Sequence, residues 1–180
     1  NKNVMNQTTD IPILGIVARS GTGKTTLIEK LIPLLSKKQL KIAVIKHSHH
    51  TFQWDTPGKD SARFRQSGAR QILLASPNQW VHYTETQTAQ VPTLKCAIER
   101  LDKSACDLIL VEGFTRETFS KIEVYRRELK QPPLFAGDSN IIAVVSNGPL
   151  VTGKLPLLPL DDTQGIADYI YEHLTAFSGS

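Results

Sequence analysis

Residues Ala18 to Thr25 read Ala-Arg-Ser-Gly-Thr-Gly-Lys-Thr, a combination suited to holding phosphate groups. Glycines such as Gly21 and Gly23 let a backbone bend until successive N–H groups point at phosphate oxygens. Lys24 would bridge the β- and γ-phosphates of a nucleoside triphosphate, and the hydroxyl of Thr25 would reach Mg²⁺. The loop therefore predicts a nucleotide-binding site that also takes magnesium.

The flanking sequence supports this interpretation of the loop. The short apolar run 11–17 precedes it and leucines at helical spacing follow it, so the expected order is strand, loop, helix. The N-terminus of such a helix adds partial positive charge where phosphates bind. Ala18 takes the place of the first glycine that is usual in this pattern. The predicted nucleotide ligands in this stretch are Ser20, Gly21, Thr22, Gly23, Lys24, Thr25 and Thr26.

A carboxylate is expected beside this loop, at the end of a neighbouring strand. The run Asp107-Leu-Ile-Leu-Val leads to Glu112, and open α/β sheets gather their ligands at the carboxyl ends of strands. We assign Glu112 two roles, as part of the Mg²⁺ shell and as a catalytic group that orients an attacking water. The alternative is a strand-end carboxylate in solvent.

The segment 47–60 also follows a strand and should reach the same edge. In nucleotide switches a loop at this position often senses the γ-phosphate and the metal, so Asp55 and Asp60 are candidates. We favour Asp60 as a catalytic and metal-associated residue, together with Lys24 and Glu112, because Asp60 stands at a predicted helix start. Its alternative role is the N-cap of that helix.

Three histidines, His47, His49 and His50, stand in the same segment. Neutral imidazole is a common ligand of transition metals. No cysteine or fixed fourth ligand is nearby, so we favour contacts to phosphate or a switch function over a dedicated metal site.

Another polar residue, Asn147, follows the apolar run 141–145 at the same expected edge. Its side chain has both donor and acceptor groups, which suits contact with a nucleobase. The full Asn-Lys-x-Asp guanine signature is absent, so the choice of base stays open at this point. The alternative is an ordinary turn after a strand.

These residues need a scaffold that brings strand ends together. Apolar strands alternate with helices, which predicts an α/β fold of the P-loop NTPase type, a mostly parallel sheet with helices on both faces. Two β-rich runs, 71–76 and 80–84, predict an inserted β-hairpin. Pro33 is expected to kink or end the first helix, because proline lacks the N–H and its ring clashes. The other expected strands are 11–17, 41–46, 107–111, 121–126 and 141–145, and the other expected helices are 60–68, 92–101 and 163–176.

Size and composition set the wider limits. The 180-residue length suits a single domain, expected over 11–177 after a flexible tail 1–10. Lys and Arg outnumber Asp and Glu by 21 to 17, but they are scattered, so no nucleic-acid partner is expected. No apolar run approaches the roughly 18–20 residues that cross a bilayer, so no membrane partner is expected. The two cysteines and the lack of a secretory signal favour the cytoplasm.

Several motifs together give the chain a family resemblance. The sequence resembles the molybdopterin-guanine dinucleotide biosynthesis protein B (MobB) family along nearly its whole length. The histidine segment and the Glu-Gly-Phe element are the more specific parts, since the phosphate loop is generic. The motifs are Ser20-Gly-Thr-Gly-Lys-Thr-Thr26, Ile45-Lys-His-Ser-His-His50, Pro57-Gly-Lys-Asp-Ser61, Thr84-Glu-Thr86 and Asp107-Leu-Ile-Leu-Val-Glu-Gly-Phe114.

The resemblance implies an adaptor in the assembly of molybdenum cofactor. It implies a homodimer that binds GTP with Mg²⁺ and hydrolyses GTP slowly, with the guanylyltransferase MobA as partner and molybdopterin as a further ligand. On this reading, the hairpin 71–84 would join the sheets of two subunits through its edge.

Two other functions remain as alternatives. A metal-delivery GTPase is motivated by His47, His49 and His50. A small-molecule kinase is the other, because the same phosphate loop can position ATP for transfer, although no Arg-rich lid is evident.

Overall fold

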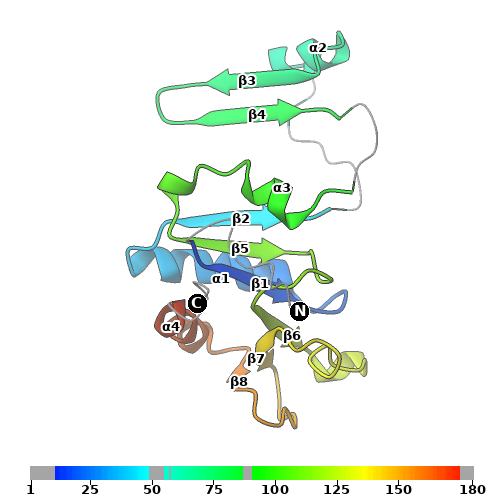
Figure 1. Cartoon of the computed structure of the whole chain (residues 1–180), viewed down its shortest axis with the longest axis vertical. Helices are drawn as coiled ribbons and strands as arrows, with labels where there is room; N and C mark the ends of the chain where they lie inside the picture. Colours follow the sequence, from blue (N-terminus) through cyan, green and yellow to red (C-terminus); the bar gives the residue numbers. More distant parts are fainter. Residues whose placement is uncertain (1–10, 49–54, 57, 87–90, 175–180) are drawn as a thin grey trace, which may run out of the picture. The chain divides into compact units, whose positions relative to one another are not determined.

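The structure is a computed structural model of the chain and describes residues 11–48, 55–56, 58–86 and 91–174. The chain separates into two compact units (Figure 1). The first unit comprises Asn1–His47 and Thr93–Ser180, and the second is Ser48–Pro92. The expected tail 1–10 lies outside the described residues, and the single domain 11–177 stays a prediction.

A six-stranded sheet forms the centre of the first unit. Its strand order is β2-β5-β1-β6-β7-β8, and every neighbouring pair is parallel. Parallel strands covered on both faces are apolar along their whole length, which is why the sequence pattern predicted all of them except the short β8. The strands are β1 (Ile13–Val17), β2 (Ile42–Lys46), β5 (Leu108–Glu112), β6 (Lys121–Tyr125), β7 (Ile141–Ser146) and β8 (Leu157–Pro159).

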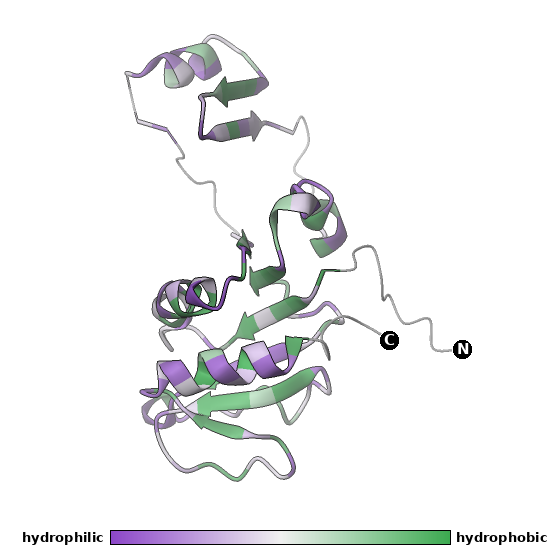
Figure 2. Cartoon of the chain, turned by 90° about the vertical axis from the view of Figure 1, so that its left-hand side faces the viewer, coloured by the Kyte–Doolittle hydropathy of each residue, from purple (hydrophilic) through white to green (hydrophobic). Residues whose placement is uncertain are grey.

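Helices cover both faces of this sheet, as predicted. Helices α1 (Lys24–Lys37) and α4 (Thr163–Glu172) share a core with one face, and α3 (Leu94–Ile98) shares a core with the other. Successive side chains of β5 point to opposite faces of the sheet and so contribute to both cores. Leu110 lies in the core with α1, and Val111 lies in the core with α3. Figure 2 shows the strands of the sheet largely in green, and the helices beside them with both green and purple residues, as amphipathic helices have. No helix in the described ranges is both long and apolar enough to cross a bilayer.

Helix α1 begins at the phosphate loop and continues past Pro33. The helix has 14 residues with Pro33 inside it, so Pro33 does not end the helix, and the alternative of a kink stays a prediction. Leu31 and Leu35, on either side of Pro33, are both 0% exposed. Their burial in the core holds the helix together across the position where proline removes one hydrogen bond.

The second unit contains the predicted hairpin. Strands β3 (Gln71–Ala75) and β4 (Trp80–Thr84) are antiparallel, with Ala75 opposite Trp80. Helix α2 (Asp60–Gln66) precedes them and contacts β3. The hairpin is therefore confirmed as a separate two-stranded sheet.

The sequence pattern missed the short elements. β8 is only three residues long and ends in Pro159, so it presents no period to detect. The 3₁₀ helices η1 (Lys103–Ala105) and η2 (Arg127–Leu129) were also not expected. The helix expected over 92–101 is shorter in the structure, where α3 begins at Leu94 and ends at Ile98.

Candidate nucleotide-binding site

The phosphate loop connects β1 to α1, as the sequence predicted. Gly21 and Gly23 have φ values of 79° and 88°, which residues with a Cβ atom rarely adopt. Gly23 is also the N-cap residue of α1. The loop thus ends at the helix N-terminus, where unpaired N–H groups and the helix dipole favour an anion.

Contacts inside the loop hold its curvature. The Thr22 hydroxyl donates to the carbonyl of Arg19 at 3.1 Å, and Lys24 Nζ donates to the carbonyl of Ala18 at 3.3 Å. Thr22 is only 2% exposed. Because Lys24 uses the backbone carbonyl of residue 18, a feature shared by all residues, Ala18 serves this contact as well as glycine would.

Arg126 braces the loop from outside. It follows β6, and its Nε donates to the carbonyl of Thr22 at 2.7 Å. In a trans peptide the carbonyl and the next N–H point in opposite directions, so this contact turns the N–H of Gly23 away from Arg126. Sequence reasoning missed this residue, and the available signal was a basic residue directly after a buried strand.

Glu112 lies where the sequence predicted, at the end of β5 beside the loop. The Thr25 hydroxyl donates to its two carboxylate oxygens at 3.2 and 3.4 Å. Lys46 Nζ lies 3.4 Å from the same carboxylate, whose side chain is 15% exposed. The alternative of a carboxylate held in open solvent therefore does not describe this residue.

A hydroxyl and a carboxylate side by side fit a magnesium ion. Mg²⁺ takes oxygen ligands and usually combines one or two protein groups with water and substrate phosphates. Thr25 and Glu112 are the residues that would hold it. No group of three or more His, Cys, Asp and Glu side chains suited to a metal occurs among the described residues.

Asp60 lies in the second unit, at the first position of α2. Its side chain is 83% exposed and pairs with Arg63 at 3.7 Å. Lys59 takes the N-cap position, so the alternative of Asp60 as the N-cap is wrong. Its assignment as a catalytic and metal-associated residue stays a prediction. Asp55, by contrast, pairs with Arg65 at 3.3 Å and is only 4% exposed.

The histidine segment is described only at its start, since His49 and His50 lie outside the described residues. His47 stacks on Phe114, with ring centroids 4.5 Å apart. Gly113 makes this possible, because its φ is 108° and an added Cβ would lie 2.6 Å from the Cβ of His47. The Glu-Gly-Phe element therefore fixes the end of β2 against the end of β5.

Asn147 lies in the wall of a cavity that begins at the phosphate loop. The cavity has a volume of about 370 Å³, within the roughly 300–1,000 Å³ range of small-molecule sites. Asn147 Oδ1 accepts the N–H of Arg127 at 3.2 Å, and its Nδ2 donates to Glu128. The predicted base-contacting residue is thus in place, but its amide also holds η2. The lining residues are Gly23, Thr26, Leu27, Lys30, Arg126, Asn147, Leu160, Asp161 and Thr163.

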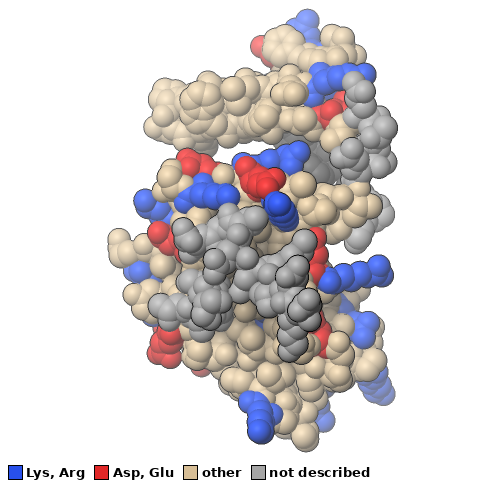
Figure 3. All heavy atoms as spheres, in the orientation of Figure 1, with Lys and Arg blue, Asp and Glu red and all other residues tan. Residues whose placement is uncertain are grey.

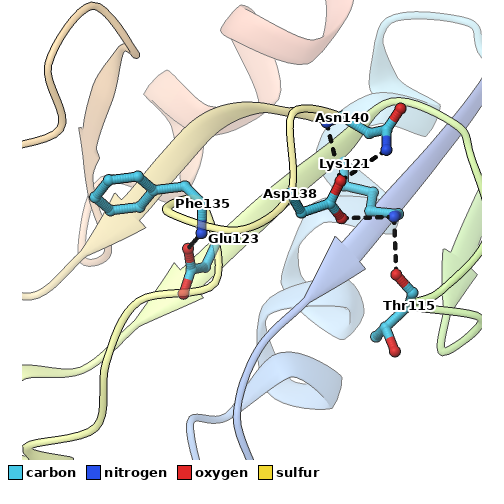
Figure 4. Close-up of polar contacts among 6 residues, drawn as sticks. All are labelled: Thr115, Lys121, Glu123, Phe135, Asp138 and Asn140. Atoms are coloured by element: carbon cyan, nitrogen blue, oxygen red, sulfur yellow. Dashed lines mark hydrogen bonds and ion pairs between the residues drawn. The ribbon is translucent and has the colours of Figure 1, made fainter.

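A second cavity, of about 300 Å³, is lined in part by Arg19, Leu134 and Asp138. Asp138 and Leu134 are hydrogen-bonded to two buried charged residues of β6, Lys121 and Glu123, which are drawn in Figure 4. Lys121, 1% exposed, donates to Asp138 at 2.7 Å and to the carbonyl of Thr115 at 2.9 Å. Burial alone would raise the pKa of Asp138, but hydrogen bonds from Lys121 and Asn140 outweigh it, and the pKa is lowered.

Glu123 is the other buried charge on β6. It is 1% exposed, and its oxygens accept the backbone N–H groups of Leu134 and Phe135 at 2.7 and 2.9 Å. Burial raises the pKa of Glu123, against the opposing effects of those two N–H groups and of Arg19. Lys121 and Glu123 together fasten the connection from β6 to β7 over the sheet.

Charged side chains of both signs share the face drawn in Figure 3. On this face, Lys and Arg lie among Asp and Glu. The absence of a nucleic-acid partner stays a prediction.

The fold and the site can be compared with known proteins. A family model described as "Molybdopterin guanine dinucleotide synthesis protein B" matches residues 13–147. A molybdopterin-guanine dinucleotide biosynthesis adapter protein of Haemophilus influenzae is 42% identical over 94% of this chain and 93% of its own length. The adapter protein of the same name from Escherichia coli is 41% identical over 95% of this chain and 98% of its own length.

Solved structures give the same result for the fold. A crystal structure of molybdopterin-guanine biosynthesis protein B has a TM-score of 0.66 and 28% identity, covering 90% of this chain and 99% of that one. Bacillus subtilis MobB has a TM-score of 0.72 at 24% identity, covering 91% of this chain and 98% of that one. The phosphate loop, the Glu-Gly-Phe element and these matches agree: the chain belongs to the molybdopterin guanine dinucleotide synthesis protein B (MobB) family.

Proposed function

We propose that this protein binds GTP with Mg²⁺ at the phosphate loop and acts as an adapter in the biosynthesis of molybdopterin guanine dinucleotide. The pathway is proposed from the names of its relatives. The observation that carries the nucleotide part is the contact between Thr25 and Glu112, at 3.2 Å, directly after the glycine-bent loop. It places a hydroxyl and a carboxylate together at the end of a loop shaped for anions.

Different groups of the site would act on the phosphates in different ways. Backbone N–H groups of the loop, the N-terminus of α1 and the Lys24 ammonium stabilise negative charge on the phosphate oxygens. Thr25 and Glu112 would hold Mg²⁺, and the ion would neutralise charge on the phosphates. Arg126 keeps the Thr22–Gly23 peptide in the orientation that this site needs.

We propose that hydrolysis is slow, and the surroundings of Glu112 support this. A group that orients water works best when its oxygens are available to that water. The Thr25 hydroxyl shares its one hydrogen between the two oxygens of Glu112, and Lys46 Nζ lies 3.4 Å from the same carboxylate, so part of its capacity to accept hydrogen bonds is already used. Asp60 stays the other proposed catalytic carboxylate.

A homodimer is the proposed assembly, through the hairpin of the second unit. Its large apolar side chains are exposed, with Trp80 at 70% and Leu73 at 59%. Exposed apolar surface on a two-stranded sheet favours association with another chain. We further propose the cytoplasm as location, the guanylyltransferase MobA as partner and molybdopterin as a ligand, all by family analogy.

Nucleotide binding and partner capture test this proposal. In calorimetric titrations, the wild-type protein should bind GTP, and the affinity should fall when Mg²⁺ is removed. A phosphate-release assay should show slow hydrolysis of the bound GTP. The guanylyltransferase should copurify with the protein in the presence of GTP. Absence of GTP binding would refute the nucleotide part of the proposal. Copurification of the guanylyltransferase that is the same with and without GTP would refute an adapter controlled by nucleotide.

The metal-delivery alternative gains no support from the described residues. The ring of His47 is stacked on Phe114 at 4.5 Å, where it serves packing. Stoichiometric Ni²⁺ or Zn²⁺ binding that disappears when His47, His49 and His50 are replaced would revive that alternative.

A further inference from the structure

We infer that Asp161 is the residue that selects guanine over adenine, by accepting two hydrogen bonds from the base. This inference rests on the proposed nucleotide binding and specifies the base at the same site. The sequence offered no guanine signature after Asn147, and the structure supplies a carboxylate from a different loop. Asp161 follows β8 and lies in the wall of the 370 Å³ cavity that starts at Gly23 and Thr26.

The cavity extends from the phosphate loop to the ends of β7 and β8. Gly23 and Thr26 line it where the phosphates would bind, while Asn147 and Asp161 line it where those two strands end. A nucleotide whose phosphates occupy the loop would therefore direct its nucleoside along this cavity. Leu160 provides an apolar wall there, as a base face requires.

Contacts of its two neighbours fix the backbone of Asp161. On one side, the N–H of Leu160 donates to the carbonyl of Ser146 at 2.9 Å, which ties the loop to the end of β7. On the other side, Asp162 is the N-cap of α4, and its side chain accepts the N–H of Gly165 at 2.8 Å. The backbone of Asp161 is thus held between two anchored neighbours, which lowers the cost of ordering this loop around a ligand.

The chemistry of the cavity points to guanine. Among the described residues that line it, Asp161 is the only carboxylate, and an ionised carboxylate only accepts hydrogen bonds. Guanine presents two adjacent donors, its ring N1–H and its exocyclic amine, which match the two oxygens. Adenine presents an unprotonated N1 beside its amine, so a carboxylate would face a lone pair. That mismatch penalises ATP.

Asn147 is less suited to this selection. Its amide oxygen already accepts from Arg127 and its nitrogen donates to Glu128. An amide can also turn to suit either base, because it offers a donor and an acceptor. We therefore assign Asn147 to positioning the cavity wall and Asp161 to reading the base.

Substitution of Asp161 by Asn should change the preferred base from guanine to xanthine, which tests the inference. In D161N the amide keeps one acceptor but places a donor opposite the guanine amine, while xanthine, which has a carbonyl there, becomes a matching partner. We expect GTP affinity to fall by about tenfold to a hundredfold, as for loss of one bidentate base contact. Affinity for xanthosine triphosphate should rise in the same variant. Asp162→Asn is the matched control, because Asn also caps helices.

Titrations of GTP, ATP and xanthosine triphosphate separate the possible results. Wild-type preference for GTP over ATP, with the preference moved to xanthosine triphosphate only in D161N, supports the inference. Equal affinity of the wild type for GTP and ATP, or an unchanged order of affinities in a folded D161N protein, would overturn it. Failure of the wild type to bind any triphosphate would instead refute the proposed nucleotide site.

Discussion

The two units of this protein use similar apolar strands in opposite ways. In the sheet unit Leu110 and Val145 are 0% exposed, whereas in the hairpin unit Trp80 is 70% and Leu73 is 59% exposed. The sheet buries its strands between helices, and a buried scaffold is rigid enough to hold the proposed phosphate-binding groups in place. The hairpin leaves its apolar side chains uncovered within its own unit, which suits the proposed association surface. On the proposed function, the first unit would carry the chemistry and the second would carry the assembly.

Replacing the buried lysine of the sheet unit should have the largest effect. Lys121→Met leaves the carboxylate of Asp138 without its ammonium partner, and breaking such a pair costs about 3–5 kcal/mol of unfolding free energy. Chemical denaturation measures it, with exposed Lys154→Met as control. Since the pKa of Asp138 is lowered, this contribution is present above the ordinary Asp pKa and is lost as pH falls through the lowered value. Equal stability of K121M and wild type would show that the pair does not hold the sheet unit together.

The hairpin comes next, and its replacement tests the other half of the comparison. Trp80→Ser should weaken the dimer by about 2–4 kcal/mol, the size of an interface hot spot, and leave GTP affinity of the monomer unchanged. Analytical ultracentrifugation over a concentration series measures the dimer. Val151→Ser is the control, because Val151 is an exposed apolar residue of the sheet unit. A W80S protein that associates like the wild type would remove the assigned role of this surface.

Arg126 should matter for ligand binding more than for stability. Arg126→Ala removes one charge-assisted hydrogen bond to the Thr22 carbonyl, worth about 1.5–3 kcal/mol. We expect GTP affinity to fall by about tenfold or more, with partial recovery in Arg126→Lys. Exposed Arg127→Ala is the neighbouring control. If R126A loses thermal stability but keeps its GTP affinity, Arg126 is structural only.

Glu123 should give the smallest effect, visible as a pH dependence. Its folded pKa is raised above the ordinary value of about 4.3, so the folded state binds more protons than the unfolded state between these two values. Stability relative to Glu123→Gln should therefore be highest below the ordinary pKa and decline as pH rises through the raised one. Urea unfolding of both proteins across this window, with exposed Glu99→Gln as control, measures the decline. A difference that grows with pH would contradict the raised pKa.

The sequence was a good guide where burial leaves a continuous signal. Strands covered on both faces, such as β5, are apolar throughout, so their ends and hence Glu112 could be placed before the structure was known. The phosphate loop could also be predicted from the sequence, because the positive φ values at positions 21 and 23 require glycine, and both Gly21 and Gly23 are present.

Contacts that depend on side-chain direction could not be predicted. Arg126 donates to Thr22, 104 positions away in the sequence, and no local pattern encodes that contact. Strand β8, which precedes Asp161, has three residues and ends in proline, so it is too short for any period. The expected helix end at Pro33 was wrong because core packing of its neighbours overrides the local preference of proline.

The nucleotide site itself is tested most directly by GTP titration of Lys24→Ala, with Lys37→Ala at the other end of α1 as control. Lys24 Nζ lies over the loop, 3.3 Å from the carbonyl of Ala18, whereas Lys37 is in the last turn of the helix. The predicted result is tight, Mg²⁺-dependent GTP binding by the wild type and K37A, and no detectable binding by a K24A protein that remains folded and dimeric. Unchanged GTP affinity in K24A would contradict the assignment of this loop as the phosphate site.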